Sequence, residues 1–582
     1  MQIKSSFRLH NSYIYCNAMR IYNQTDKCLI AILFTALVLR LTAISFEMPY
    51  IYLNTDEDKV IVNALRMGAD GSLNPKMFLY PSLYLYVALS EFLAYYFLGT
   101  ITGTFHSAQD FAYSYFRDPT IFFVMVRVTS ALLGTATVYV TFRLGKLILN
   151  RQVALVSACI LSFCWLHVFY SHQAIVDVPA TFFTSLAILF SLMFYRSPNL
   201  RYATLTGIMI GLATGTKYPA GAVVVSGFSA CLLTSLPTAK RLQWIIYISI
   251  LSLLTFVMTT PYCIIDFPTF LIFIKVIIFL HGGTDILMTH FLKTHGLSYY
   301  LFITIPNAIG WIPLLISFIG YLYLLTKHTH TAIITGSHVF LLMTVMGSST
   351  LFYDRFILPI MPLIALFCGV GVVFIISQLL RIIHKTYIVL AIIIVFIPIV
   401  LTTLVGDIQL SQTDTRVIVK QWIEENIPTG AKIFSEAHGP QLHLNHEAAK
   451  AYLAVANESS GERGQGRTYK YILDHPEHPQ SYYLLSRGSR DTPAPLDYYV
   501  NDGYRYFILV STVFVPFMND PFISPPHTLF YDSIKKRCRL IKEVDKQTFD
   551  KSQNAEDINN LLIRLFGRYG PRILVYELNT PS

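Results

Sequence analysis

Long apolar runs recur along this chain and constrain its fold more than any other feature. Residues 28–46, 356–376 and 387–405 are examples, each close to the roughly 20 residues that an α-helix needs to cross a bilayer. A soluble protein would have to bury all such runs beneath polar surface, but only 13% of the residues are charged, against about 25% in a soluble domain. The runs therefore predict a polytopic α-helical membrane protein.

The basic residues lie mostly between the apolar runs, where cytoplasmic loops carry Lys and Arg. The net charge of +10 could also suit a nucleic-acid-binding protein. The chain lacks the basic patch with interleaved aromatics that such proteins show, so no nucleic-acid partner is expected. The short loops predicted to be cytoplasmic contain Arg143, Lys146 and Arg151; Arg196 and Arg201; Lys240 and Arg241; Lys327; and Arg381 and Lys385.

This charge pattern requires that one apolar stretch in the first external loop does not cross the membrane. Residues 83–98 and 121–141 are both apolar, and if both crossed, every later basic loop would lie outside. Residues 83–98 include Glu91 and are surrounded by tyrosines, which favour the membrane interface. We therefore expect that stretch to lie along the outer face.

The resulting topology has about eleven spanning helices and an N-terminus that acts as an uncleaved signal anchor. The expected starts of the spans are near residues 28, 121, 152, 178, 203, 218, 243, 301, 332, 356 and 387. The expected parts are a cytoplasmic N-terminus (1–27), a transmembrane domain (28–405) with external loops at 47–120 and 261–300, and an external C-terminal domain (406–582).

The C-terminal domain differs from the rest in composition, because charged and turn-forming residues become frequent after residue 406. Residues 415–426 have a helical pattern that Pro428 and Gly430 end. Residues 504–513 and 572–576 alternate in the manner of strands. The sequence therefore predicts a small α/β domain.

Three consecutive carboxylates, Asp56, Glu57 and Asp58, follow the first span. A carboxylate at the outer surface can serve as a general base for an acceptor hydroxyl. Asp56 and Asp58 could alternatively hold a divalent metal ion. The structural alternative is that the three residues solvate the helix end and cap the next helix.

Further polar side chains are predicted at the same face of the membrane. Ionisable residues in or near spans are costly, which makes them functional candidates, although Lys and Arg can also extend to the lipid headgroups. Carboxylates together with cations at the outer leaflet suit chemistry on a lipid phosphate, in which the base activates the acceptor and the cations neutralise the leaving phosphate. The candidates are His172, Asp177, Lys217, Tyr353 and Arg355.

Several segments resemble, in order, the C-type (GT-C) glycosyltransferases of the family 39 type, the branch with protein O-mannosyltransferases and the lipid A aminoarabinose transferase. An acidic pair, Asp56 and Glu57, precedes a Gly-x-Leu-Asn-Pro turn at residues 71–75 and a Tyr-Pro element at residues 80–83. The later similar segments are RVTSALLGTATVYVTFRLG from Arg127, SHQAIVDVPATFF from Ser171, GLATGTKYPA from Gly211 and YDRFILPIMPLIAL from Tyr353.

The resemblance implies a GT-C fold and an inverting single displacement at the outer face of the membrane. Asp56 would be the general base, assisted by Glu57, and the donor would be a sugar on dolichyl or undecaprenyl monophosphate. Lys217 and Arg355, together with Arg127, would bind the donor phosphate. No cofactor would be required, although a divalent metal could take part.

A multi-span transporter or lipid flippase is the alternative function. Transporters usually show repeated halves and charged sites near the bilayer midplane, whereas this chain has no visible repeat and gathers its charges at one face. The sequence leaves open the sugar, the acceptor (protein, lipid or glycan), and whether the membrane is the cell membrane or that of the endoplasmic reticulum.

Overall fold

The computed structural model describes residues 27–50, 56–282, 296–349, 351–382, 384–458, 463–488, 491–519, 524–547 and 566–579. The expected cytoplasmic N-terminus therefore lies almost entirely outside the described residues. The chain divides into two compact units. The helical unit comprises Met1–Ile44, Ser72–Glu91 and Met125–Leu404, and the sheet unit comprises Ser45–Gly71, Phe92–Val124 and Val405–Ser582.

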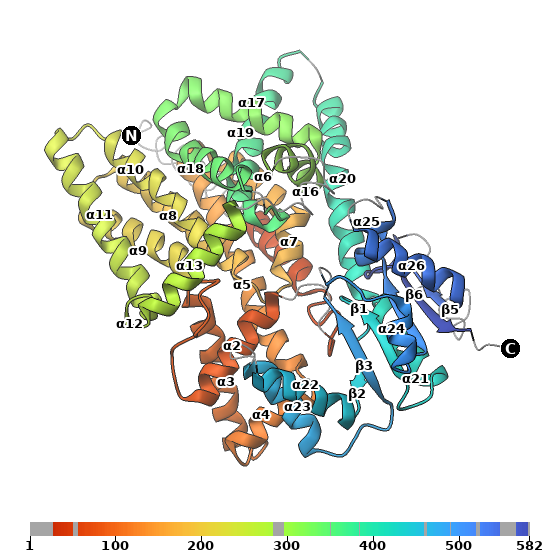
Figure 1. Ribbon diagram of the computed structural model, residues 1–582. Coiled ribbons are helices and arrows are strands. Elements are labelled where there is room, and N and C mark those ends of the chain that lie inside the picture. The colour runs from red at the N-terminus through yellow and green to blue at the C-terminus, as the bar shows by residue number, and fades with distance from the viewer. Residues whose placement is uncertain are drawn as a thin grey trace, which may run out of the picture. The chain divides into compact units, whose positions relative to one another are not determined.

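The apolar runs form helices, beginning with a helix over residues 27–41 (Figure 1). The following helices, up to the end of the last apolar run, are α2 Asp56–Asp70, α3 Leu83–Ile101, α4 Ala108–Arg117, α5 Thr120–Ile148, α6 Arg151–Ser162, α7 Trp165–Ser171, α8 Asp177–Arg196, α9 Leu200–Thr216, η1 Tyr218–Val223, α10 Val224–Leu232, α11 Thr238–Thr259, α12 Tyr262–Ile265, α13 Phe267–Gly282, α15 Gly296–Tyr299, η2 Tyr300–Thr304, α16 Ile305–Ile309, α17 Trp311–Lys327, α18 Thr329–Gly347, η3 Asp354–Ile360, α19 Met361–Leu379 and α20 Lys385–Ser411.

Length and composition give fewer spans than the eleven expected. Among the described residues, seven helical segments are long and apolar enough to cross a membrane, or nine if two bent pairs each count as one span. Three expected spans do not pass the test: the first, whose described helix covers residues 27–41, the fifth, α9, which has only 17 residues, and the sixth, a short apolar segment at Tyr218–Leu232. The prediction of a multi-pass helical membrane protein is confirmed. Helix α3 passes the same test, so its predicted interfacial position remains a prediction.

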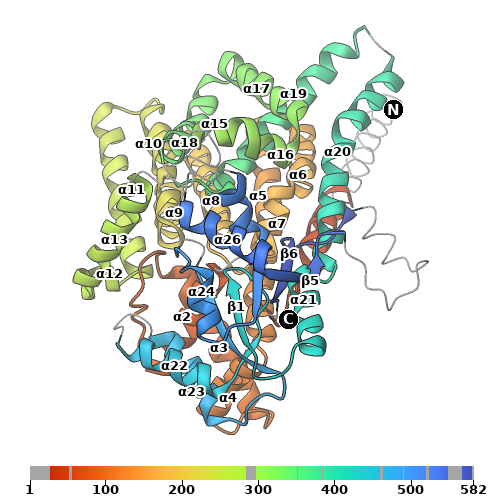
Figure 2. The ribbon, with the colours of Figure 1, turned by 45° about the vertical axis from the view of Figure 1, so that its right-hand side comes forward.

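Close helix packing in the helical unit depends on glycines. Gly207, Gly211 and Gly215 recur every fourth residue on α9, and a Cβ added at each would meet α11 atoms at 2.2–3.0 Å. Small residues at this spacing allow helix backbones in membranes to approach closely. Helices α9 and α11 accordingly lie side by side in both views (Figures 1 and 2).

Two of the expected spans are bent rather than straight. Helices α6 and α7 differ in direction by 59°, and the segment Gly296–Ile309 makes an angle of 107° with α17. The second bend falls at Gly310, whose φ of +88° is a conformation that favours glycine. Each bent pair looks like one continuous span in the sequence, because a break of one or two residues hardly changes a mean hydropathy taken over 18 residues.

The sheet unit contains a six-stranded mixed sheet in the order β2-β3-β1-β4-β6-β5. Strands β1 to β4 are parallel to their neighbours among themselves, and β6 is antiparallel to β4 and β5. The elements are α21 Thr415–Asn426, β1 Lys432–Glu436, β2 His443–Leu444, α22 His446–Glu458, α23 Arg463–Asp474, β3 Ser481–Arg487, α24 Leu496–Asn501, β4 Tyr506–Val510, α25 Ser511–Asn519, α26 Pro525–Arg537, β5 Cys538–Val544 and β6 Ile573–Leu578.

The structure confirms the predicted α/β character of the C-terminal domain. The predicted helix over residues 415–426 is α21, and both predicted strands are present as β4 and β6. Asp414 precedes helix α21, and its side chain caps the helix by accepting a hydrogen bond from the Arg416 amide. Its apolar face, with Val419 and Ile423, packs into the core beneath the sheet.

Candidate functional site

A buried ion pair joins two of the predicted site residues in the helical unit. Asp177 is the first residue of α8, and Lys217 follows the last residue of α9. The Lys217 ammonium donates to the Asp177 carboxylate, and their side chains are 8% and 2% exposed. The ammonium also lies 4.7 Å from the centre of the Phe356 ring, a distance typical of a cation–π contact. Lys217 is thus a buried cation held between a carboxylate and an aromatic face.

Arg355 lies against the same aromatic ring. Its guanidinium carbon is 4.5 Å from the centre of the Tyr353 ring and 5.8 Å from that of Phe356. The Tyr170 hydroxyl is a further hydrogen-bonding partner of Arg355. The structure therefore brings together four predicted residues, Asp177, Lys217, Tyr353 and Arg355, which we call the cation cluster.

Two aromatic rings complete this cluster and were not predicted from the sequence. Phe356 joins the two cations, and Tyr170 approaches Arg355 from the end of α7. The only available signal was that Phe356 directly follows Arg355 in the Tyr-Asp-Arg-Phe segment. A second omission, Asp354, accepts a hydrogen bond of 2.6 Å from the Thr304 hydroxyl and so ties η3 to the π-helical turn η2.

His172 and Arg127 contact a different part of the helical unit. The two ring nitrogens of His172 lie 2.9 Å from the Val168 carbonyl oxygen and 2.8 Å from that of Thr42. Arg127 donates to the Ile44 carbonyl at 3.1 Å. Both side chains are fully buried. They therefore satisfy backbone carbonyls just past the helix over residues 27–41, where the chain no longer makes helical hydrogen bonds.

The acidic run opens α2 in the sheet unit. Asp56 and Glu57 are 7% and 1% exposed, and Asp56 accepts a hydrogen bond of 2.5 Å from Lys59. Burial and the neighbouring Glu57 charge raise the pKa of Asp58 to about 6. Carboxylates at a helix N-terminus are stabilised by the helix dipole, which agrees with the structural alternative. Burial of two adjacent carboxylates goes beyond simple solvation of a helix end.

No group of three or more His, Cys, Asp or Glu side chains that could hold a metal ion occurs in the described part of the chain. Binding of a metal ion by Asp56 and Asp58 therefore remains a prediction, and the described residues offer no third His, Cys, Asp or Glu ligand for it.

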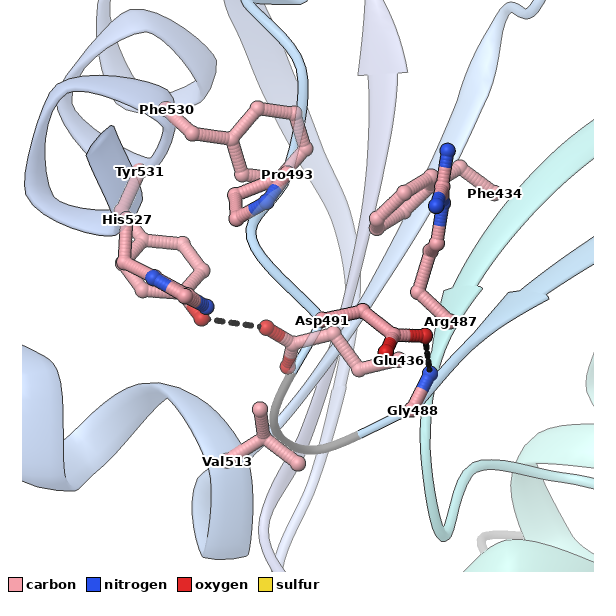
Figure 3. Close-up of a pocket in the computed structure, with 10 residues that line it drawn as sticks. All are labelled: Phe434, Glu436, Arg487, Gly488, Asp491, Pro493, Val513, His527, Phe530 and Tyr531. Atoms are coloured by element: carbon pink, nitrogen blue, oxygen red, sulfur yellow. Dashed lines mark hydrogen bonds between the residues drawn. The ribbon is translucent and has the colours of Figure 1, made fainter. Parts of the chain in front are cut away.

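The C-terminal domain contains a small polar cavity at the carboxyl end of its parallel strands (Figure 3). Glu436 ends β1 and accepts hydrogen bonds of 2.6 Å from both the Tyr531 hydroxyl and the Val510 amide. Burial raises the pKa of Glu436 to about 7. The free space is about 10 Å³, which is room for a single water molecule. The cavity is thus too small for a sugar, and the hydrogen bonds of Glu436 beside it form a buried network.

Comparison with known proteins identifies a family segment within the helical part. Residues 122–265 match the family described as dolichyl-phosphate-mannose-protein mannosyltransferase. A search of curated proteins finds no match. The family match confirms the resemblance to the C-type glycosyltransferases, and the chain is accordingly a membrane glycosyltransferase.

Three solved structures show the range of structural similarity. The apo oligosaccharyltransferase of Archaeoglobus fulgidus has a TM-score of 0.48 at 10% identity, over 84% of this chain and 70% of that one. ArnT from Cupriavidus metallidurans bound to undecaprenyl phosphate has a TM-score of 0.47 at 11% identity, over 94% and 97%. The S. cerevisiae protein O-mannosyltransferase Pmt1–Pmt2 complex bound to the sugar donor has a TM-score of 0.28 at 19% identity, over 44% and 33%.

Proposed function

We propose that this chain transfers a sugar from a polyprenyl monophosphate, dolichyl or undecaprenyl, to a hydroxyl of a protein, lipid or glycan acceptor. The transfer takes place at the outer face of the cell membrane or at the lumenal face of the endoplasmic reticulum. The N-terminus is cytoplasmic and the C-terminal domain lies on the side where transfer occurs. The family that matches residues 122–265 is named for a dolichyl-phosphate donor and a protein acceptor, which supports a lipid-linked donor.

The cation cluster is the observation that carries the proposal. Buried cations in a membrane protein are costly, usually have a partner of opposite charge, and mark sites where substrates or ions bind. Lys217 and Arg355 come from segments that are far apart in sequence, yet both lie against Phe356. Arg355 can bind a phosphate through two parallel hydrogen bonds, while Lys217, oriented by Asp177, acts as a point charge.

The proposed reaction is a single displacement. The acceptor hydroxyl oxygen bonds to the anomeric carbon as the bond from that carbon to the phosphate oxygen breaks. The acceptor proton passes to Asp56, and the polyprenyl phosphate leaves with the electron pair of the broken bond. Glu57 assists Asp56, and no metal ion is required for the step. Inversion at the anomeric carbon follows from one displacement.

The test is incubation of the purified chain with radiolabelled polyprenyl-phosphate sugars and a membrane extract. The labelled product would identify the donor and the acceptor together. Asp56→Asn keeps the shape of the side chain but deletes the base, so transfer should fall by roughly 10²–10⁴-fold. Glu425→Gln, at an exposed position on α21, is the matched control. An Asp56→Asn variant within a few-fold of wild type would show that another group is the base.

A further inference from the structure

The chain just before the candidate base is held on the first helix of the C-terminal domain. Arg416 on α21 donates from Nη2 to a Glu47 carboxylate oxygen at 2.8 Å, and both side chains are 4% exposed. Its Nε and Nη2 also bind the two oxygens of Asp414 at 2.7 Å each. A bidentate pair of this kind fixes the guanidinium in one orientation. The guanidinium that binds Glu47 is therefore fixed in orientation.

A second contact lies one helical turn further along α21. The Lys420 ammonium is 5.4 Å from the centre of the Tyr50 ring, and its other partner is Glu424 at 2.5 Å. Glu47 itself has a φ of +63°. A non-glycine residue in this region is strained and persists where its surroundings hold it. The contacts of Arg416 and Lys420 supply that constraint.

The far end of α2 and the neighbouring helix α4 also contact the C-terminal domain. Asp70, the last residue of α2, pairs with Arg467 on α23 at 2.7 Å. Phe116 of α4 stacks on Tyr471 of α23 at 5.0 Å, and Tyr113 meets the same ring edge-on at 5.2 Å. Helices α4 and α23 lie beside each other in both views (Figures 1 and 2). Glu47 and Tyr50, which precede Asp56, and Asp70, which follows it, are therefore all in contact with the C-terminal domain.

We propose that the C-terminal domain positions the candidate base, and that Glu47 and Arg416 are the positioning residues. This inference rests on the proposed function, because it assigns the domain a role in the same transfer. The alternative is a module that is merely displayed beside the membrane. A displayed module would need no buried ion pair to the chain close to the acidic run. The anchored segment ends six residues before Asp56, so a loosened anchor would displace the start of α2.

The kinetic test compares two substitutions at Glu47. Glu47→Ala removes the anchor but leaves Arg416 paired with Asp414, so no buried cation loses its last partner. Its kcat should fall roughly 10–100-fold, since a misplacement of about 1 Å can cost 10²-fold. The dissociation constant for the donor lipid should stay within two-fold. Glu47→Gln keeps the acceptor oxygen and should recover most of kcat, and Glu425→Ala is the control for α21.

Two further measurements separate this inference from the proposed function. Hydrogen exchange of the intact chain should show faster exchange in α2 for Glu47→Ala, with unchanged exchange in β1 and β4. In an Asp56→Asn background, Glu47→Ala should lower kcat no further. Unchanged α2 exchange, an additive loss of kcat, or a loss of donor binding would each overturn the positioning role. If Asp56→Asn stays active, Asp56 is not the base, and the α2 exchange still decides whether the anchor exists.

Discussion

Lys217→Met tests whether the buried ion pair stabilises the fold, binds the donor, or does both. The substitution preserves the apolar stem of the side chain but removes the charge. The sequence alone suggests that such a variant should stay folded. The structure changes that expectation, because Asp177 is 2% exposed and would keep a buried carboxylate without its cation. Removing one partner of a buried pair typically costs about 3–5 kcal/mol.

The double variant Lys217→Met, Asp177→Asn separates stability from donor binding. It removes both charges, so stability should return close to that of wild type. Donor affinity should stay low, because a charged hydrogen bond to phosphate contributes about 1.5–3 kcal/mol, or about 10–150-fold in Kd. Lys327→Met, at an exposed position at the end of α17, is the control for loss of a lysine.

Thermal unfolding with a thiol-reactive dye reports mainly on the helical unit, because the buried thiols of Cys164, Cys231, Cys263 and Cys368 lie there, against Cys538 in the sheet unit. Titration with the donor lipid gives Kd for each variant. A Lys217→Met variant as stable as wild type would refute the reasoning about the pair. A double variant that is stable and binds donor with wild-type affinity would remove Lys217 from the phosphate site.

Three further predictions follow from the same structure. Arg355→Lys keeps the charge but loses the planar guanidinium, so donor affinity should fall by about tenfold. Arg143→Lys, which also removes an arginine stacked on a tyrosine, is the control and should bind donor normally. Equal donor affinities in the two variants would contradict a bidentate role for Arg355. The pKa of Glu436 is about 7 in the folded protein, against 4.5 for the free group. Protonated Glu436 therefore contributes about 3 kcal/mol to the free energy of unfolding. This contribution is full below pH 4.5 and is lost as the pH rises through 7. Glu436→Gln should therefore flatten the pH dependence of the opening free energy that hydrogen-exchange protection gives for β1 and β4 between pH 5 and 8. An unchanged slope would refute the assignment. Cysteines placed at the exposed positions Leu73 and Thr104 test whether α3 crosses the membrane. If α3 does not cross, both should react with an impermeant thiol reagent from outside. Labelling of only one would mean that α3 crosses and that the later loops lie on the opposite side of the membrane from the predicted one.

The sequence predicts the helices well, because a long apolar run can form little else in a membrane. The expected starts near residues 121, 152, 178 and 387 fall within two residues of helices α5, α6, α8 and α20. Helix α21 has the predicted bounds, since Asp414 caps its start and Pro428 and Gly430 follow its end. Bends such as the one at Gly310 were not predictable, because they depend on one or two backbone torsions that leave hydropathy unchanged.

The site is less accessible to sequence reasoning, because its contacts join distant segments. Lys217 and Asp177 are 40 residues apart, and Glu47 and Arg416 are 369 residues apart. No periodic pattern encodes either pair. The sequence also divides the chain at residue 406, whereas the first loop, Ser45–Gly71, belongs to the same compact unit as the C-terminal domain.

The structure also changes which argument supports Lys217 and Arg355. From sequence, both are notable because charge bias should exclude cations from outer loops. That argument weakens, since Asp177 balances Lys217 and two aromatic rings support Arg355. The contact of both cations with the Phe356 ring is stronger support for a shared site, because two lipid-facing cations would have no reason to share that ring. Extension to lipid headgroups would leave the lysine side chain largely exposed, and at 8% exposure Lys217 does not fit that description.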